Sequence, residues 1–419
     1  MKKVCMLTSG HLYNDNRIFY KEARTLQENG YNVSVIAPVN KDGYFLNNSN
    51  QPTFKPQSNK IIEKQIEVYG YHKTFRKDVN KNIDELRYDI HMDFISNINN
   101  ENIDDLEINL INLGMEIDAD IYHAHEISSV YAAVKIKQLK AVQGKKIKVV
   151  YDVHEFFPSI YRDTVAKTDF YKKKYEEMII EFEKTVLPYC DLVVTVSNSI
   201  KEYLESLNKN TYIDLIRNVP TKLGPSYEKI ENDMPIICYE GYIRFERGLR
   251  EIMESCSVLK TIYPEFKLVF IGGAVGDEKS YLDREIEERD LHNNIIQTGW
   301  LTPDKAHEEI CKCDIGLQLL NNIPNCQVAL PNKLFNYMRA GLAVIGMNYK
   351  EISSVMKNAN CGLLINKLDS NLLTNAMINL IEQSRLLNYF KKNSRIAFES
   401  SYNWEKEGEK LLKLYTEFC

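Results

Sequence analysis

Residues 329–347, ALPNKLFNYMRAGLAVIGM, carry the groups best suited to binding a phosphate. Pro331 suits the first turn of a helix, because its missing N–H would be unpaired there anyway, and Gly341 would end that helix before an apolar strand over 342–347. A helix N-terminus presents free N–H groups and a partial positive charge, and Lys333 adds a full charge at the same end. The segment therefore predicts either an anion site or an ordinary buried helix followed by a strand.

Histidine and acidic residues follow two other predicted strands. His125 and Glu126 follow a strand over 120–124, and His154 follows a strand over 146–152. Acidic and histidine side chains at the end of a buried strand are costly unless they are paired or exposed in a site. These residues predict a site, and a structural His–Asp pair is the alternative that the same physics allows.

Strands alternate with helices on both sides of these residues, which predicts parallel, doubly wound sheets. The N-terminal half begins with a strand over 3–8, a helix capped by Asn14 or Asp15 and a strand over 31–37. Residues 40–60 are polar and predict a surface loop, and 78–115 predict mostly helix with a break near 99–102. The remaining elements expected in this half are a strand near 61–69, strands over 192–196 and 212–216, and helices over 128–143, 169–186 and 197–207.

A polar segment without periodicity, 223–235, is the expected linker to a second α/β series. The chain has 419 residues, which is long for a single core and favours two domains. The expected elements after the linker are strands over 236–240, 266–271, 294–298, 314–320 and 362–365, helices over 249–262 and from 302 onward, and closing helices from 371 to the end.

Composition limits the class of protein. With 44% hydrophobic and 26% charged residues the chain is typical of soluble globular proteins, and its formal net charge of -5 argues against binding nucleic acid through bulk charge. No apolar run approaches the length of about 20 residues that a membrane span needs. Cys5, Cys190 and Cys238 lie on or beside apolar strands, so we expect buried free thiols in a reducing compartment.

The whole chain resembles the retaining glycosyltransferases of family 4, which have the GT-B fold. The resemblance rests on five segments, namely 9–18, the HAHE string at 123–126, the D-x-H-E-x-x-P string at 152–158, 239–248 and the P-x-K helix at 331–347. It implies an α/β protein with two Rossmann-like domains and an interdomain cleft. Residues 1–222 would bind the acceptor, 235–403 would bind the nucleotide sugar, and the final helix, 404–419, would pack back on the first domain.

The resemblance also implies roles for individual residues. His125, Glu126 and His154 would be catalytic, with His125 against the transferred sugar, and His11, Asp15 and Arg17 would contact the acceptor. The residues expected to bind the donor are Gly10, Gly241, Arg244, Arg247, Gly299, Asn332, Lys333, Leu334 and Asn336. No metal is expected, because arginine and lysine would neutralise the diphosphate.

Three positions depart from the family pattern. Tyr242 stands where an arginine is usual, with Arg244 as a candidate substitute, and Val328 and Asn336 stand where the family has two glutamates. An asparagine can still hydrogen-bond a ribose, but without the charge that strengthens such bonds. The departures leave the identity of the donor open.

The implied activity is transfer of a hexose or N-acetylhexosamine from a nucleoside diphosphate sugar to an acceptor hydroxyl, with retention and without a cofactor. A UDP-sugar is favoured over a GDP-sugar, and a saccharide or lipid-linked saccharide is the expected acceptor, in surface polysaccharide or glycolipid biosynthesis. The expected location is the cytoplasm, with contact to the inner face of the membrane through the basic, aromatic segment 171–175 as an open alternative. Two other functions stay open: a nucleotide-sugar 2-epimerase of the same fold, and a binding protein that has lost the chemistry.

Overall fold

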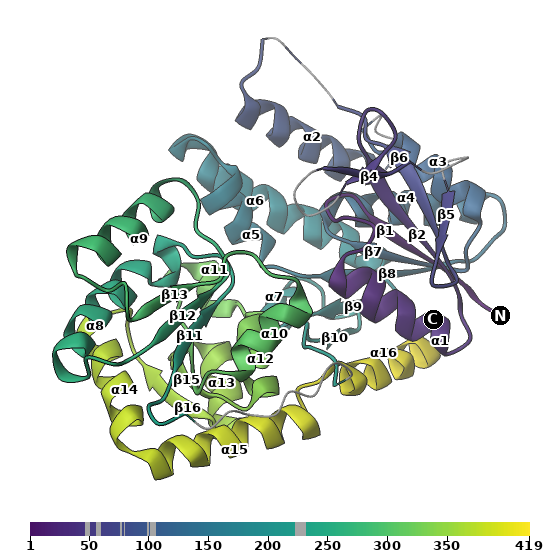
Figure 1. Ribbon diagram of the computed structural model, residues 1–419. Coiled ribbons are helices and arrows are strands. Elements are labelled where there is room, and N and C mark those ends of the chain that lie inside the picture. Colours follow the sequence, from purple (N-terminus) through teal and green to yellow (C-terminus); the bar gives the residue numbers. More distant parts are fainter. Residues whose placement is uncertain are drawn as a thin grey trace. The chain divides into compact units, whose positions relative to one another are not determined.

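The computed structural model describes residues 1–46, 51–55, 60–75, 78, 80–98, 100, 106–222 and 232–419. The chain folds as two compact units, shown in sequence colours in Figure 1. Unit 1 consists of residues 1–217 and 408–419, and unit 2 consists of residues 218–407. The division falls at 217/218, a few residues before the predicted linker, of which residues 223–231 lie outside the described part of the chain.

Unit 1 is built on an eight-stranded sheet with the order β10-β9-β8-β7-β1-β2-β6-β5. All neighbouring strands are parallel except β5, which runs antiparallel to β6 at the edge. The chain starts in the middle of this sheet and extends first to one side and then to the other, so the strand order reverses between β1 and β7. The strands are β1 (Lys3–Thr8), β2 (Asn32–Val39), β5 (Lys60–Glu63), β6 (Ile66–His72), β7 (Ile121–His125), β8 (Lys148–Val153), β9 (Leu192–Thr195) and β10 (Ile213–Leu215).

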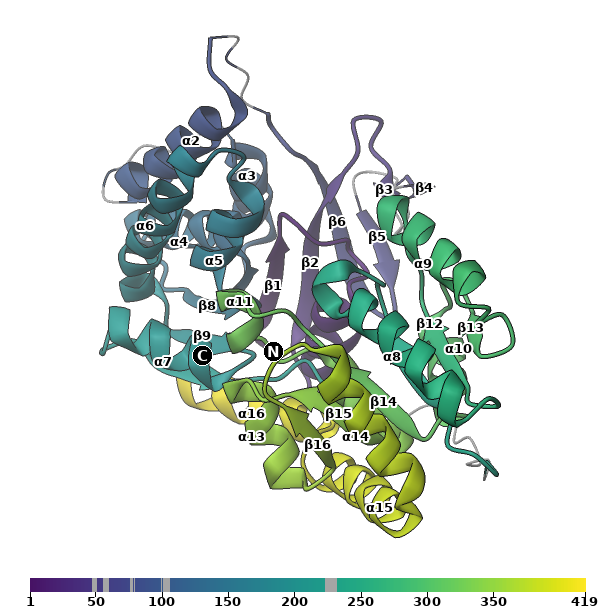
Figure 2. The ribbon, with the colours of Figure 1, turned by 90° about the vertical axis from the view of Figure 1, so that its left-hand side faces the viewer.

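Helices pack against this sheet, and the central strands are buried along almost their whole length, as is typical of parallel sheets. Figure 2 shows helices α2 to α6 gathered on one side of strands β1 and β2. The helices of unit 1 are the π-type η1 (Asn16–Ala23), α1 (Arg24–Glu28), α2 (Ile83–Ile98), α3 (Ile108–Ile117), α4 (Ile127–Val142), α5 (Phe157–Ile160), η2 (Tyr161–Val165), α6 (Asp169–Val186), η3 (Leu187–Tyr189) and α7 (Asn198–Leu207).

Two segments of unit 1 refine the expectations from sequence. The region 40–60, predicted as a loop, contains a short antiparallel pair, β3 (Phe45–Leu46) with β4 (Pro52–Phe54), while residues 47–50 and 56–59 lie outside the described part. The expected helix break near 99–102 falls between α2 and α3, where residues 99 and 101–105 are not described.

Unit 2 is built on a six-stranded parallel sheet with the order β13-β12-β11-β14-β15-β16. Its strand order reverses between β11 and β14. The strands are β11 (Ile237–Glu240), β12 (Leu268–Ile271), β13 (Ile295–Gln297), β14 (Ile315–Gln318), β15 (Ala343–Met347) and β16 (Gly362–Ile365). The helices are η4 (Phe245–Arg247), α8 (Leu249–Ile262), α9 (Gly276–Glu288), α10 (Pro303–Cys311), α11 (Pro324–Val328), α12 (Asn332–Ala340), α13 (Lys350–Ala359), α14 (Ser370–Glu382) and α15 (Ser384–Ser400).

The last helix, α16 (Trp404–Phe418), begins in unit 2 and ends in unit 1. Its C-terminal part is anchored in unit 1, where the Tyr415 hydroxyl lies 2.8 Å from Nδ1 of the buried His123 and the Phe418 ring stacks on Tyr212 at 4.0 Å between centroids. The main chain of Trp404 donates to Pro220 in unit 2. Residues 408–419 are therefore part of the packing of unit 1.

Two further expectations from composition can be compared with the structure. Cys5, Cys190 and Cys238 are buried free thiols, as predicted. None of the helices among the described residues is long and apolar enough to cross a bilayer.

Candidate functional site

The first group of candidate residues lies where the strand order of unit 1 reverses. Strands β1 and β7 are neighbours there, with Thr8 opposite His125 at their carboxyl ends. In open parallel sheets the crevice outside such a reversal is the usual place for a ligand. The loop after β1 and the residue after β7, Glu126, meet at this point.

His11 links these two segments. Its ring lies 3.4 Å from the Asp15 carboxylate and 2.9 Å from that of Glu126, and about a quarter of each of the three side chains is exposed. Asp15 also caps helix η1 by accepting from the N–H groups of Arg17 and Ile18, as the sequence predicted for the residue at the start of this helix. Burial alone would lower the pKa of His11, but its contacts with Asp15 and Glu126 raise it to about 10. The loop therefore holds an imidazolium between two carboxylates at neutral pH.

Gly10 makes room for this arrangement. A Cβ at Gly10 would lie 2.0 Å from Oε2 of Glu126, a distance that no real contact tolerates. Glu126 itself has a φ of 73° and a ψ of 175°, a backbone conformation that is rare outside glycine and stores strain. The strain and the absent Cβ both serve to place the Glu126 carboxylate against His11.

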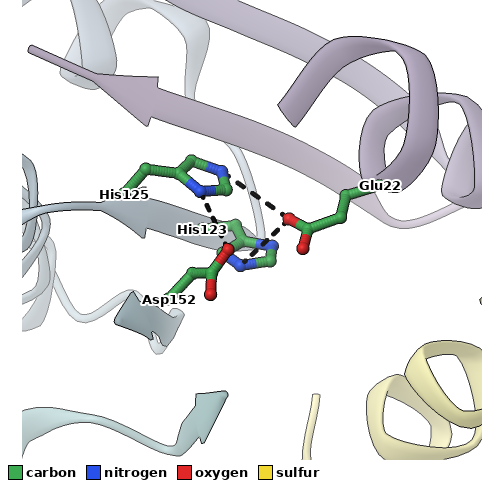
Figure 3. Close-up of side chains that lie close together, drawn as sticks. All are labelled: Glu22, His123, His125 and Asp152. Carbon is green, nitrogen blue, oxygen red and sulfur yellow. Dashed lines mark hydrogen bonds and ion pairs between the residues drawn. The ribbon is translucent and has the colours of Figure 1, made fainter. Parts of the chain in front are cut away.

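A largely buried network lies next to His11, whose ring centroid is 5.2 Å from that of His154. Arg17 donates to both oxygens of Asp152, over 2.7 and 2.8 Å, and to the carbonyl of Ile216 over 2.9 Å. Asp152 also contacts Nδ1 of His125 at 3.2 Å and Nε2 of His154 at 2.7 Å. Figure 3 shows His125 and Asp152 together with His123 and Glu22, which comes from helix η1.

Arg17 governs the charges in this network. Its guanidinium lies 3.1 Å from the Glu22 carboxylate and is only 3% exposed. Burial would raise the pKa of Asp152, but Arg17 and His154 outweigh it and hold this pKa well below its usual range. Burial raises the pKa of Glu22 well above its usual range and lowers that of His125 to about 4. The network therefore contains one buried ion pair, Arg17–Asp152, beside Glu22 and His125, whose pKa shifts both favour the neutral form.

Glu22, His123, His125 and Asp152 are residue types that bind metals, and they lie close together (Figure 3). Oε2 of Glu22 is 3.7 Å from His123 Nε2 and 3.9 Å from His125 Nε2. However, the two imidazole rings are stacked at 4.6 Å with 20° between their planes, so their in-plane lone pairs run nearly parallel instead of converging on one ion. Arg17 already pairs with Asp152 and lies 3.1 Å from Glu22. The geometry favours an ion-pair network over a metal centre.

In unit 2 the strand order reverses between β11 and β14, and the two strands separate at their carboxyl ends. The Tyr337 hydroxyl stands between them, accepting from the N–H of Glu240 at 2.8 Å and donating to the carbonyl of Leu317 at 3.2 Å. The Tyr337 ring reaches this position across Gly316, where a Cβ would lie 2.5 Å from the ring. Helix α12, which carries Tyr337, is thereby fixed against the point of reversal.

The N-terminus of α12 faces the same region. Pro331 is the residue before the helix, with an extended ψ of 139°, so α12 begins at Asn332, and no side chain caps it. Lys333 is 7% exposed, and its Nζ lies 3.7 Å above the Tyr239 ring without a hydrogen-bond partner among the described residues. Burial and the nearby Arg247 lower the pKa of Lys333 well below its usual range.

A carboxylate lies beside this lysine. Asn336 donates from Nδ2 to both oxygens of Glu240, over 2.7 and 3.0 Å, and both side chains are half-buried. Burial raises the pKa of Glu240, and Lys333 opposes that shift. The end of β11 and the first turns of α12 thus hold a lysine, a glutamate and free helix N–H groups close together.

The other predicted donor residues lie at the same edge of the unit 2 sheet or behind it. Arg247 is half-buried and interacts with Tyr239. Arg244 is exposed, with its guanidinium 4.3 Å from the Tyr242 ring, which is 5.3 Å from Trp300. Gly241 and Gly299 both have positive φ, Asn332 is exposed, and Leu334 is fully buried, so that only its main chain could meet a ligand.

Comparison with known proteins decides the class. Residues 106–219 match the family Glycosyltransferase Family 4, and residues 226–397 match the family Glycosyl transferases group 1. The chain is a glycosyltransferase. Its two sheets give it the GT-B fold, as predicted, and the two matched families meet close to the division between the units.

Solved structures that resemble this glycosyltransferase cover its whole length. A sucrose-phosphate synthase from Thermosynechococcus elongatus aligns over 100% of this chain and 99% of its own, with a TM-score of 0.70 and 14% identity. Anabaena Alr3699/HepE in complex with UDP-glucose aligns over 100% of both chains, with a TM-score of 0.67 and 11% identity. A structure described as trehalose-6-phosphate from E. coli bound with UDP-2-fluoro glucose aligns over 100% of this chain and 99% of its own, with a TM-score of 0.65 and 9% identity. At these identities the likeness establishes the fold.

Sequence reasoning missed three residues that organise the two candidate sites: Glu22, Glu240 and Tyr337. Glu240 could have been found, because it is an acid at the end of an apolar strand, directly before Gly241. Glu22 and Tyr337 lie on helices, and nothing in their sequence neighbourhood indicates which buried polar group they meet.

Proposed function

We propose that the glycosyltransferase moves a sugar from a nucleoside diphosphate donor to an acceptor hydroxyl with retention, and that unit 2 binds the donor. The observation that carries the proposal is Lys333, a buried lysine without a hydrogen-bond partner among the described residues, at the open N-terminus of α12. A buried ammonium is costly unless an anion accompanies it. A diphosphate would supply that anion and would also accept from the helix N–H groups.

This arrangement suits the chemistry of glycosyl transfer. Negative charge develops on the diphosphate as the bond to the sugar breaks, so fixed cations and N–H groups aimed there lower the barrier. Lys333, Arg247 and the first turn of α12 would provide them, without a metal or cofactor. In the proposed retaining reaction the acceptor attacks from the face that the diphosphate leaves, and the diphosphate takes the acceptor's proton.

Unit 1 would hold the acceptor through the loop after β1. His11, Asp15 and Glu126 are partly exposed and offer both a cation and carboxylates to hydroxyl groups. His125 and Arg17 are buried beneath them, so we propose that these two side chains position the loop and Glu126. His154, which is 13% exposed, would connect the buried network to the loop through its ring contact with His11.

The proposal also covers the class of acceptor and contact of the protein with a membrane. A saccharide or lipid-linked saccharide fits a hydroxyl-binding loop. The basic segment at the start of α6 is a candidate for contact with an anionic membrane, because Phe170 is 66% exposed and Lys174 lies 4.1 Å above its ring. Lys172 and Lys173 form local ion pairs with Asp169 and Glu177. Membrane binding would compete with these exposed pairs, which are weak.

The first experiment is calorimetric titration and thermal shift with UDP, GDP, ADP, CDP and their glucose and N-acetylglucosamine conjugates. A ligand at about a hundred times its Kd should stabilise the protein by roughly 2.7 kcal/mol. Lys333→Met should weaken binding of the diphosphate, whereas the exposed Lys357→Met should leave it unchanged. NMR of the product then gives its anomeric configuration.

The outcomes separate the competing functions. An inverted product overturns retention, and a donor sugar that changes configuration at C2 without any acceptor indicates an epimerase. Absence of binding to every nucleotide overturns the assignment of unit 2 as a donor domain and favours a protein that has lost the chemistry.

A further inference from the structure

Glu240 and Asn336 are not needed to bind a diphosphate, yet they stand beside the Lys333 site. We infer that Glu240 binds neighbouring hydroxyl groups of the nucleotide sugar and that Asn336 orients it. The inference rests on the proposed function of unit 2. The donor site would then contain a carboxylate from strand β11, Glu240, next to a position of helix α12 where the side chain is the amide of Asn336.

The position of Glu240 is fixed at both ends. Its N–H donates to the Tyr337 hydroxyl over 2.8 Å, and its two carboxylate oxygens accept from Asn336 Nδ2 over 2.7 and 3.0 Å. Tyr337 and Asn336 are consecutive residues of α12. The carboxylate is therefore held rigidly against the same helix whose N-terminus carries Lys333.

The carboxylate has accepting capacity to spare. Two carboxylate oxygens offer about four lone-pair positions, and a single amide group uses only part of them. Glu240 is half-buried, so part of the residue is open to solvent and to a ligand. Adjacent hydroxyl groups, such as those on a ribose or hexose ring, match the two oxygens of one carboxylate, and O–H donors to a carboxylate make short, strong hydrogen bonds.

The surrounding charges favour a hydroxyl over an ion as the partner. Lys333 opposes the rise that burial causes in the pKa of Glu240, and the charged form of Glu240 would repel an anion. Phosphate would thus be directed to Lys333 and hydroxyl groups to Glu240. A ligand that carries both groups a few bonds apart, as a nucleoside diphosphate sugar does, fits both at once.

Asn336 is matched to this arrangement. An acid at position 336 would place two carboxylates within hydrogen-bond distance, and their repulsion would turn Glu240 away or force one of them to keep a proton. The amide instead donates to Glu240 and holds it. Asparagine at 336 and glutamate at 240 therefore act as a pair.

The test compares UDP with 2′,3′-dideoxy-UDP by calorimetry, or GDP with its dideoxy form if GDP binds more tightly. Wild type should bind the ribose form more tightly. Glu240→Gln should weaken UDP binding by about tenfold or more, the loss expected for a charged hydrogen bond, and leave dideoxy-UDP binding unchanged. Glu246→Gln removes an exposed acid from the same loop and should change neither. Asn336→Glu added to Glu240→Gln should restore part of the preference for ribose.

UDP-glucose distinguishes the two sources of hydroxyl groups. If Glu240→Gln weakens UDP-glucose but not UDP, the hydroxyl groups belong to the transferred sugar, and the inference holds for that ring. An equal loss for UDP and dideoxy-UDP overturns the inference, because Glu240 then acts only through Lys333. The inference is also overturned if Glu240→Gln weakens the binding of none of the three ligands. Wild type that binds no nucleotide overturns the donor assignment itself, and this inference with it.

Discussion

Replacement of Arg17 by methionine should destabilise unit 1 severely. The guanidinium makes two hydrogen bonds to Asp152 and one to the Ile216 carbonyl, and it also contacts Glu22. All of these groups are buried, so water cannot replace the hydrogen bonds that they lose. Methionine fills much of the same volume, so that the loss reports on charge and hydrogen bonding more than on a cavity.

The expected loss follows from the partners left behind. Breaking a buried ion pair by removing one member costs about 3–5 kcal/mol, because the other charge stays buried. Asp152 would keep its contacts with His154 at 2.7 Å and His125 at 3.2 Å, which places the loss near the lower limit, about 3 kcal/mol.

Urea unfolding followed by far-UV circular dichroism measures this loss. With a urea dependence of about 2–3 kcal/mol per M, the midpoint should fall by about 1 M. Both tryptophans, Trp300 and Trp404, lie in unit 2, so their fluorescence serves as an internal reference for that unit. Arg24→Met, which removes an exposed ion pair with Glu28 from the following helix, should cost less than about 0.5 kcal/mol.

A double variant tests whether the cause is the unpaired charge. Arg17→Met with Asp152→Asn removes both members, so its loss should be well below the sum of the two single losses. A single-variant loss under about 1 kcal/mol, or strictly additive losses, would refute the reasoning that Arg17 compensates Asp152.

Three further changes test other parts of the structure. Gly316→Ala should destabilise unit 2 by about 1–3 kcal/mol, since the new Cβ would press against the Tyr337 ring, and urea unfolding followed by tryptophan fluorescence should show it. Glu183 is fully buried, and burial raises its pKa to about 8. The folded protein then holds a proton that the unfolded chain has lost, so wild type should lose stability relative to Glu183→Gln as the pH rises from 5 to 8, by up to about 1.4 kcal/mol per pH unit; parallel urea midpoints that do not diverge with pH would contradict this. Replacing lysines 172–174 by glutamine should lower binding to vesicles rich in phosphatidylserine at low salt, and an unchanged sedimented fraction would rule out membrane contact through this segment.

Most strands could be predicted from the sequence, because apolar runs bounded by polar turns identify buried parallel strands. Helices with a weak apolar stripe were missed: α9 buries only Leu282, Glu285 and Ile286, and its charged residues hide the period. The segments 324–328 and 350–359 were not predicted as helices either. The short pair β3–β4 depends on contacts between chain segments and has too few residues for a local signal.

The sequence singled out residues that the structure places near the carboxyl ends of neighbouring strands, as His11 and Glu126 illustrate. The partners of these residues could not be predicted, because a contact such as Glu240 with Asn336 joins positions 96 residues apart. The sequence also did not indicate which of the polar side chains are buried. Arg17 lies close to His11 in sequence, yet its side chain is buried in the interior, where it donates to Asp152.

Helix α16 has a consequence for the order in which the protein can be assembled during synthesis. Residues 408–419 leave the ribosome only after all of unit 2, yet they cover His123 and Tyr212 in unit 1. The packing of unit 1 therefore cannot be completed until unit 2 has been translated, and part of its interior stays uncovered until then. A ribosome that stops before residue 408 would release a chain whose second sheet is intact and whose first sheet still exposes a buried histidine and an aromatic face to chaperones and proteases.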